Sequence, residues 1–178
     1  KTNEYRNLKG GDRYEEVEEN PMLGYRGCSR YVTEPDVFKL EIEALKKVRE
    51  SFSNLWVMIP FVRRVEGLAH CRDILEEEGL TRSEDFKLWM MVEVPSNIIL
   101  IDRFIDVGLD GISIGSNDLT QLVLGIDRDS PKLADAFDER DQAVLWCLER
   151  AISRTRRRRI TCSICGQAPS EYPEVTEK

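Results

Sequence analysis

The chain has 178 residues, of which 41% are hydrophobic, 33% are charged and 8% are aromatic, a profile typical of a globular domain that excludes a disordered or fibrous chain. Its 33 Asp and Glu residues outnumber its 26 Lys and Arg residues, which gives a formal net charge of −7. Because nucleic-acid-binding proteins use an excess of basic residues to neutralise phosphates, we expect no nucleic-acid partner.

The first third of the chain predicts a loop followed by alternating strands and helices. Residues 1–20 are polar and end at Asn20-Pro21, so we expect a loop that leads into a short strand at residues 22–26. Residues 37–48 carry apolar side chains at helical spacing. Residues 55–60 are almost continuously apolar and end at a proline, which is typical of a strand buried on both faces.

The same alternation continues along the chain. Helices are predicted at residues 65–78, 98–104, 119–124 and 142–152, and strands at residues 88–95, 111–115 and 160–164. We expect Gly79 to end the first of these helices, and Asn117 or Asp118 to cap the third. Buried strands that alternate with helices indicate an α/β fold with parallel strands.

The number of strands bears on the kind of α/β fold. A closed (β/α)8 barrel has eight parallel strands and typically ~250 residues, whereas the sequence predicts five strands in 178 residues. We therefore interpret the chain as an incomplete fragment of a TIM-type barrel.

Polar residues stand where the predicted strands end. They are Arg26, Glu93, Asn117, Asp118 and Cys165. In parallel α/β folds, the carboxyl edge of the sheet carries the active site. Glu93 and Asp118 follow neighbouring strands, and two carboxylates suit Mg²⁺, which completes its shell with water and substrate oxygens. The alternative, which spacing alone leaves equally open, is that Asp118 caps a helix and Glu93 pairs with an arginine.

A second group of residues is suited to anions. The segment Gly115-Ser116-Asn117 precedes a predicted helix, and backbone N–H groups at a helix start can hold phosphate or carboxylate oxygens. Arg26 and Arg128 could add bidentate contacts to the same anion. Each of these features is common in isolation, so neither identifies a ligand by itself.

Cys162 and Cys165 have the spacing of a redox dithiol or of half a zinc site. In a strand, however, residues three positions apart point to opposite faces, and the single histidine, His70, lies in a distant helical segment. We therefore interpret Cys162 as a core residue, Cys165 as a single reactive thiol and His70 as a helix-surface residue.

Composition also bears on location. No stretch approaches the ~20 apolar residues of a membrane span, and residues 1–5 lack the features of a signal peptide. We therefore expect a cytoplasmic protein without a membrane partner, with its five cysteines as free thiols. The basic run at residues 154–159 is interpreted as the C-terminal end of a helix rather than as a nucleic-acid or membrane patch.

Taken together, these motifs resemble the phosphoenolpyruvate-binding barrel of the phosphoenolpyruvate (PEP)-utilising enzymes. The resemblance rests on six stretches that occur in the family's order, at residues 20–27, 57–62, 90–95, 112–121, 125–128 and 164–170. The chain looks most like the synthase branch of the family, which uses water as the second phosphoryl acceptor. A dikinase-type enzyme that uses phosphate is the alternative within the family.

The resemblance implies a role for each candidate residue. Glu93 and Asp118 would hold Mg²⁺, and Cys165 would be the acid–base group. The phosphoryl and carboxylate groups would be held by Arg26, Arg128 and the turn Gly115-Ser116-Asn117. Glu93 and Asp118 would belong to the substrate-binding set as well as to the metal site. The implied partners are pyruvate or PEP and a phosphohistidine on a separate domain.

The chain also departs from the family pattern. By that pattern it begins after the first two barrel strands, lacks an upstream substrate-binding arginine and stops before the eighth strand. We expect residues 1–178 to be a partial PEP- and pyruvate-binding domain, without the ATP-binding and phosphohistidine domains. We also expect it to self-associate into a homo-oligomer and to be inactive alone. An alternative from another class is a catalytically inert binding or interaction module.

Overall fold

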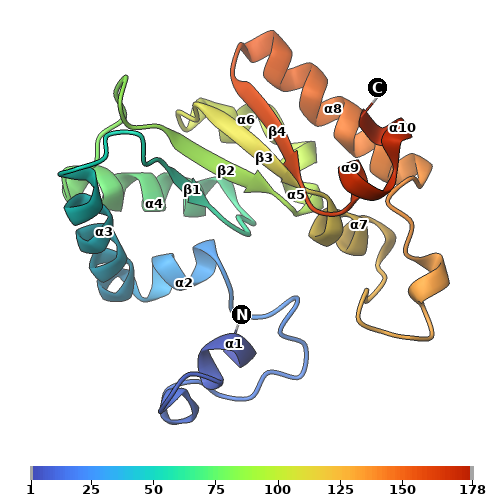
Figure 1. Cartoon of the computed structure of the whole chain (residues 1–178), viewed down its shortest axis with the longest axis horizontal. Helices are drawn as coiled ribbons and strands as arrows, with labels where there is room; N and C mark the ends of the chain where they lie inside the picture. The colour runs from blue at the N-terminus through green and yellow to red at the C-terminus, as the bar shows by residue number, and fades with distance from the viewer. Residues whose placement is uncertain (1, 177–178) are drawn as a thin grey trace.

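The structure is a computed structural model that describes residues 2–176. Its centre is a four-stranded sheet in the order β1-β2-β3-β4, and every neighbouring pair is parallel (Figure 1). The strands are β1 (Val57–Ile59), β2 (Leu88–Val92), β3 (Gly111–Gly115) and β4 (Thr161–Cys165). Because parallel neighbours need crossover connections, each pair is joined through helices, as the predicted α/β alternation requires.

The predicted helices are present. The helices are α1 (Thr2–Arg6), η1 (Gly11–Arg13), α2 (Cys28–Thr33), α3 (Pro35–Arg49), α4 (Val65–Glu77), α5 (Pro95–Ile99), α6 (Ile101–Asp106), α7 (Ser116–Leu124), η2 (Ala134–Ala136), α8 (Gln142–Arg158), α9 (Ala168–Glu171) and α10 (Pro173–Thr176). Of these, α5 and α6 replace the single helix expected at residues 98–104, because the chain turns at Leu100. No helix within residues 2–176 is both long and apolar enough to cross a membrane.

The basic run forms the C-terminal end of α8, as the sequence predicts. Two of its arginines bind acidic side chains of α6: Arg154 lies 3.5 Å from Asp102, and Arg158 lies 2.6 Å from Asp106. These arginines therefore tie two neighbouring helices together.

The strand predicted at residues 22–26 is wrong. These residues form turns that lead into α2, and they pair with no strand of the described sheet. Several of their backbone groups bind side chains instead of a neighbouring strand. The Arg63 guanidinium donates to the Leu23 carbonyl at 3.0 Å and to the Gly24 carbonyl at 2.6 Å. The structure therefore has four strands in the described part of the chain rather than five.

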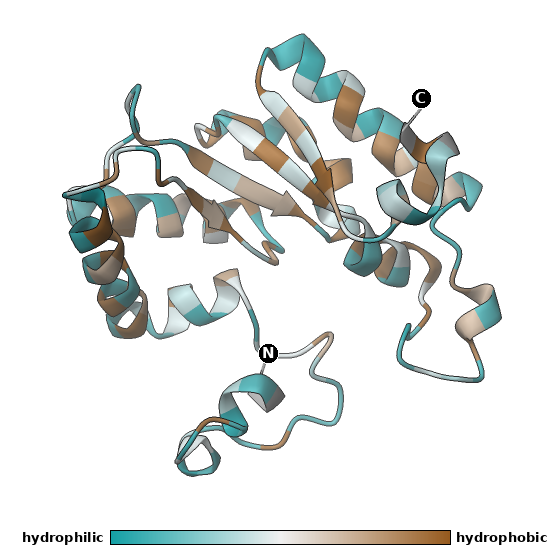
Figure 2. Ribbon diagram, in the orientation of Figure 1, coloured by the Kyte–Doolittle hydropathy of each residue, from teal (hydrophilic) through white to brown (hydrophobic). Residues whose placement is uncertain are grey.

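The two faces of the sheet differ. One face is buried under the helices and is lined by Val57, Ile59, Leu88, Met90, Val92, Ile112 and Ile114, which alternate along the strands. Figure 2 shows brown, apolar residues in the strands and teal, polar residues on the outer side of α8. The other face is more open, with Met58 of β1 42% exposed. The site described next lies at the carboxyl end of this open face.

Candidate active site

The register of the parallel strands β2, β3 and β4 brings the candidate residues together. Gly115, the last residue of β3, pairs with Cys165, the last residue of β4. Val92, the last residue of β2, pairs with Ile114, so Glu93 follows directly beside Gly115. Asp118 lies in the first turn of α7, which begins immediately after β3. Four candidate residues from three strand ends therefore meet at one edge of the sheet.

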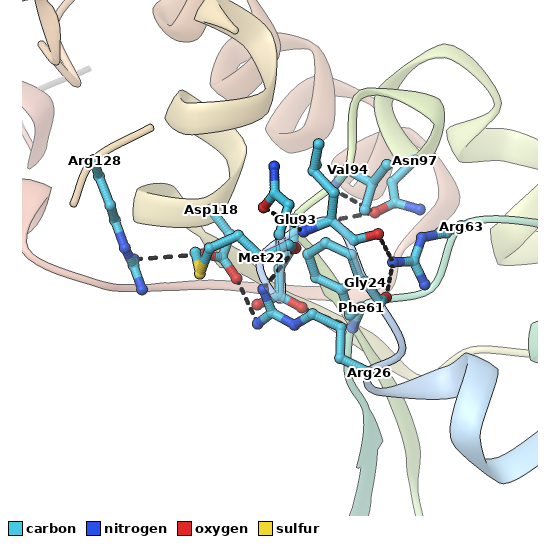
Figure 3. A network of polar contacts seen from close by, with 12 residues as sticks. Met22, Gly24, Arg26, Phe61, Arg63, Glu93, Val94, Asn97, Asp118 and Arg128 are labelled. Atoms are coloured by element: carbon cyan, nitrogen blue, oxygen red, sulfur yellow. Dashed lines mark hydrogen bonds and ion pairs between the residues drawn. The ribbon is translucent and has the colours of Figure 1, made fainter. Parts of the chain in front are cut away.

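Glu93 is held in place by backbone groups. It is 6% exposed, and its Oε2 accepts the Phe61 N–H at 2.7 Å. The Asn97 side chain accepts the backbone N–H groups of Glu93 and Val94 and donates to the Val62 carbonyl, which joins the ends of β1 and β2 (Figure 3). Phe61 adopts a left-handed φ of 48°, so the chain after β1 is bent at the residue that binds this carboxylate.

Asp118 is 7% exposed and lies between two arginines (Figure 3). Arg26 donates to its Oδ2 at 2.8 Å, while Arg128 lies 3.3 Å from its Oδ1. The Arg128 contact does not have hydrogen-bond geometry, so this buried oxygen has no hydrogen-bond donor among the described residues.

The helix cap expected at Asn117 or Asp118 is not formed, because α7 begins at Ser116 after Gly115 and no side chain caps it.

The two carboxylates interact with each other. Burial raises the pKa of Glu93 above its ordinary value, and the adjacent Asp118 carboxylate raises it further. The Phe61 N–H and the Arg26 guanidinium offset part of this effect. Two buried carboxylates in contact favour either a shared proton or a cation that both can bind.

The residues present fit a divalent cation. Asp118 Oδ1, which accepts no hydrogen bond among the described residues, supplies a ligand oxygen. The Glu93 side chain crosses the end of β3, where Gly115 has no side chain. A Cβ at Gly115 would lie 2.7 Å from the Glu93 Cγ. Within residues 2–176, no group of three or more His, Cys, Asp or Glu side chains is arranged so that it could hold a metal ion by itself. A pair of carboxylates is the set that Mg²⁺ uses when water and substrate oxygens complete its shell.

The two arginines are anchored by other groups. The Arg26 guanidinium stacks 4.0 Å from the centre of the Phe61 ring and donates to the Met22 carbonyl at 3.3 Å. The backbone N–H of Arg128 donates to the Gln121 side chain at 3.2 Å. Both cations are thus fixed next to Asp118, where they can also face an anionic ligand.

Ser116 and Asn117 bind the loop that follows β4. Ser116 is fully buried, and its hydroxyl donates to the Cys165 carbonyl at 3.2 Å. The Asn117 side chain accepts the Gln167 N–H at 3.0 Å rather than capping α7. These side chains therefore help to position the end of β4 and the loop after it.

An open cavity of about 160 Å³ collects most of these groups, but Arg26 and Ser116 are not among its lining residues. It is lined by Met91, Glu93, Gly115, Asn117, Asp118, Arg128, Cys165 and Gly166. A larger cavity of about 240 Å³ lies on the other side of Arg26 and Phe61, next to α2 and α3, and contains neither carboxylate of the pair. We therefore take the smaller cavity as the candidate active site.

The cysteines and the histidine lie as the sequence predicts. Cys165 is the one exposed cysteine in the described chain, whereas Cys162 points to the helix-covered face and packs against the core. All five thiols are free. His70 is exposed on α4.

The sequence did not point to Phe61, Asn97, Gln121 or Glu139. The first three position Glu93 and Arg128, as described above. Glu139 is a buried carboxyl next to Ser116. Phe61 directly follows a predicted strand and Gln121 lies in a predicted helix, but no spacing or residue-type pattern assigns a role in the site to any of the four.

The fold and the site define a class of protein. Acidic, basic and thiol side chains gather at the carboxyl edge of a parallel sheet, which is where α/β enzymes bind and convert their substrates. The chain belongs to the PEP-utilising enzyme family, since the family described as "PEP-utilising enzyme, PEP-binding domain" matches residues 2–177.

Individual relatives agree with this assignment. The chain is 57% identical to "Phosphoenolpyruvate synthase" of Aeropyrum pernix and 56% identical to "Probable phosphoenolpyruvate synthase" of Staphylothermus marinus, each over 99% of this chain. It is 48% identical to "Phosphoenolpyruvate synthase" of Escherichia coli over 98% of this chain. The chain spans only 22% of the length of each of these relatives.

Solved structures support the fold alone. An HpcH/Hpal aldolase/citrate lyase family protein from Burkholderia cenocepacia matches 76% of this chain, with a TM-score of 0.55 and 13% identity, over 59% of its own length. The citrate synthase SbnG matches 68% of this chain, with a TM-score of 0.52 and 19% identity, over 50% of its own length. The chain thus shares its α/β fold with these two structures.

Proposed function

We propose that this chain forms the pyruvate- and PEP-binding part of a PEP synthase. In the full reaction, ATP, pyruvate and water become PEP, AMP and phosphate through a phosphohistidine on another domain. The observation that carries the proposal is the cavity at the sheet edge, where Glu93, Asp118 and Cys165 lie together with Arg128. The names of the close relatives support it.

We further propose that the chain is part of a TIM-type barrel and that other strands of the barrel complete it in a longer protein. The four parallel strands and the uncovered sheet face support this arrangement. In that protein, the ATP-binding and phosphohistidine domains would lie outside residues 1–178, and the reaction would take place in the cytoplasm.

Glu93 and Asp118 would hold Mg²⁺. When bound, Mg²⁺ would draw electron density from a substrate oxygen and stabilise the negative charge that develops on it. Arg26 and Arg128, which flank Asp118, would bind the phosphoryl and carboxylate groups of the substrate. The backbone N–H groups of Gly115, Ser116 and Asn117 at the start of α7 would add donors to the same anion.

Cys165 would move the proton. Its thiolate takes a proton from the methyl carbon of pyruvate. The electron pair of the broken C–H bond then forms the new C=C bond, and the electron pair of the carbonyl C=O bond moves onto the oxygen, which gives the enolate. That oxygen then bonds to phosphorus while the N–P bond of the phosphohistidine breaks, so the histidine nitrogen keeps that electron pair. PEP forms, and Cys165 later returns its proton to solvent.

Two cysteine variants test this assignment in the longer protein. Cys165→Ala should abolish the exchange of pyruvate methyl protons with solvent deuterium, measured by NMR, because the one histidine of this chain lies on the outer side of α4. ATP-driven phosphorylation of the carrier histidine should survive, since it occurs in another domain.

The matched control is Cys162→Ala, three residues away. Its side chain packs against the helix-covered face, so the variant should lose only packing, at a cost of about 1 kcal/mol. If both variants lose proton exchange equally, a dithiol or metal role for the pair becomes the better interpretation and the single-thiol assignment is wrong.

A further inference from the structure

Arg63 is a half-buried arginine that the proposed mechanism does not use. It lies in the loop between β1 and α4, two residues after Phe61. Burial lowers the pKa of its guanidinium, and the positive charge of the nearby Arg26 lowers it further. A cation that is shielded from water and close to a like charge is unfavourable unless other contacts offset the cost.

The Arg63 guanidinium binds the turn that carries Arg26. One of its nitrogens donates to the Leu23 carbonyl at 3.0 Å and to the Gly24 carbonyl at 2.6 Å (Figure 3). Its other terminal nitrogen donates to the Ser29 hydroxyl in α2 at 2.8 Å. These acceptors lie on both sides of Arg26 in the chain. Because one rigid, planar group binds all three, the segment between them is held against the loop after β1.

Arg63 and Arg26 also share one aromatic ring. The Cζ atom of Arg26 lies 4.0 Å from the centre of the Phe61 ring, and that of Arg63 lies 4.7 Å from it. An aromatic ring attracts a guanidinium that lies over its face, so Phe61 supports both cations. Its backbone N–H also donates to Glu93 at 2.7 Å, which fixes this support next to the carboxylate pair.

The backbone around Arg63 is anchored as well. Its carbonyl accepts the Ser96 hydroxyl at 2.8 Å, and the preceding carbonyl, that of Val62, accepts the Asn97 side chain at 2.7 Å. Ser96 and Asn97 belong to α5, which begins directly after the end of β2. The Arg63 side chain therefore reaches the turn from a loop that is itself tied to the sheet.

We propose that Arg63 is a positioning residue for Arg26: it holds the turn at residues 22–26 against the loop after β1, so that Arg26 rests on Phe61 and reaches Asp118. This inference rests on the proposed role of Arg26 in binding the anionic groups of pyruvate and PEP. The donors of Arg63 are directed at two carbonyls and a hydroxyl, and Arg63 does not line the candidate active site. It therefore acts through Arg26 rather than on the substrate.

Arg63→Met tests the proposal in the longer protein, in the reverse reaction from PEP, AMP and phosphate to pyruvate, ATP and water. The variant keeps an unbranched side chain but removes the N–H donors. PEP carries its phosphoryl and carboxylate groups before the reaction starts, so a displaced Arg26 weakens ground-state binding. KM for PEP should rise about 10-fold while kcat stays within about threefold.

Two controls accompany this variant. KM for AMP should not change, because AMP binds to another domain of the longer protein. Arg64→Met, a change at the neighbouring exposed arginine, should leave both KM values and kcat unaltered.

A double variant separates positioning from a general loss of structure. Arg26→Met alone should raise KM for PEP at least as much as Arg63→Met does. In the Arg26→Met background, Arg63→Met should change KM for PEP less than twofold, because the residue through which Arg63 acts is already gone. An unchanged KM in Arg63→Met, or effects that multiply in the double variant, would overturn the proposal.

Arg63→Lys is a second test that does not depend on the folding of Arg63→Met, since it keeps the charge and the aliphatic stem. An ammonium lacks the planar fork, so KM for PEP should again rise about 10-fold. A wild-type KM in Arg63→Lys would show that Arg63 acts by its charge and would contradict the positioning role. If the proposed function itself fails, the unaltered protein forms no pyruvate from PEP. If only the role of Arg26 fails, Arg26→Met leaves KM for PEP unchanged.

Discussion

A single missing side chain lets the two carboxylates approach each other. Gly115 is the last residue of β3, and the Glu93 side chain, which follows the neighbouring strand β2, lies directly over this glycine. A Cβ at this glycine would lie 2.7 Å from the Glu93 Cγ, closer than packed atoms allow, and at a tight 3.1 Å from its Oε1. The role of Gly115 is therefore to give room to a side chain rather than to supply a flexible backbone.

Gly115→Ala should weaken Mg²⁺ binding. The added methyl group must displace Glu93 from Asp118, and misplacing a metal ligand typically costs 10–100-fold in affinity. Calorimetric titration of this chain with MgCl₂ in the presence of PEP measures the change. An unaltered Mg²⁺ affinity would contradict the prediction, because it would show that Glu93 does not need the space above Gly115 to bind the cation.

Gly111→Ala is the matched control on the same strand. Its Cβ would lie 2.5 Å from the Trp89 indole at the opposite end of β3. The variant should lose roughly 1–3 kcal/mol of stability through overpacking and keep its Mg²⁺ affinity.

Glu93→Gln addresses the charge of the same ligand. The amide keeps the size of the side chain and can still accept the Phe61 N–H, so the fold should be retained. It removes one of the two negative charges, so Mg²⁺-dependent substrate binding should weaken. The melting temperature with and without MgCl₂ and PEP is the measurement, and an unchanged Mg²⁺ dependence would remove the metal assignment.

At the level of elements, Asp110 ties the starts of three strands together. Its side chain accepts the Leu88 N–H at 2.9 Å and binds Arg82 at 2.7 Å, and its carbonyl accepts the Thr161 N–H at 3.2 Å. Partial burial raises its pKa, but the Arg82 guanidinium and the Leu88 N–H outweigh burial and hold the pKa below its ordinary value. The ionised form is thus favoured by folding.

Asp110→Asn should therefore destabilise the fold in a pH-dependent way. A group whose pKa is lowered on folding stabilises the native state above its unfolded-state pKa, and this contribution is lost as pH falls through the folded-state pKa. We expect a loss of about 1 kcal/mol at neutral pH that disappears in strong acid. Urea unfolding at several pH values checks this expectation, and a loss that is independent of pH would contradict it.

The elements that the sequence predicts correctly are those with a strong pattern. Apolar runs at Leu88–Val92 and Gly111–Gly115 mark buried strands, and periodic apolar residues mark α3, α4 and α8. The strand at residues 22–26 is wrong because a short apolar run also suits a turn whose carbonyls are bound by a distant arginine, Arg63. The break at Leu100 leaves no signal, because the residues on both sides are apolar.

The site is predictable to the extent that it lies at strand ends. Glu93, Asp118 and Cys165 follow predicted strands, so their proximity follows from the α/β order. Asn97, Gln121 and Glu139 depend on how loops fold back onto the sheet. Local sequence carries no record of those tertiary contacts, and the expected cap at Asn117 fails for the same reason.

At the scale of the whole molecule, the helices of residues 2–176 leave one side of the sheet open. The helices that pack on β1 to β4 cover one face, and β1 and β4 are the outer strands of the described sheet (Figure 1). On the open side, Trp56 is 47% exposed and stacks on Trp89 with 6.2 Å between ring centres. Free strand edges beside exposed apolar side chains promote association.

We therefore expect the isolated chain of residues 1–178 to self-associate, with a mass that rises with concentration in size-exclusion chromatography coupled to light scattering. Met58→Lys places a charge on the open face at an outer strand and should reduce the association. Leu40→Lys, the same change at a residue of α3 that is 66% exposed, should leave it unaltered. A monodisperse monomer with a cooperative melt at high temperature would contradict the expectation, because the open face would then be stable in water without a partner.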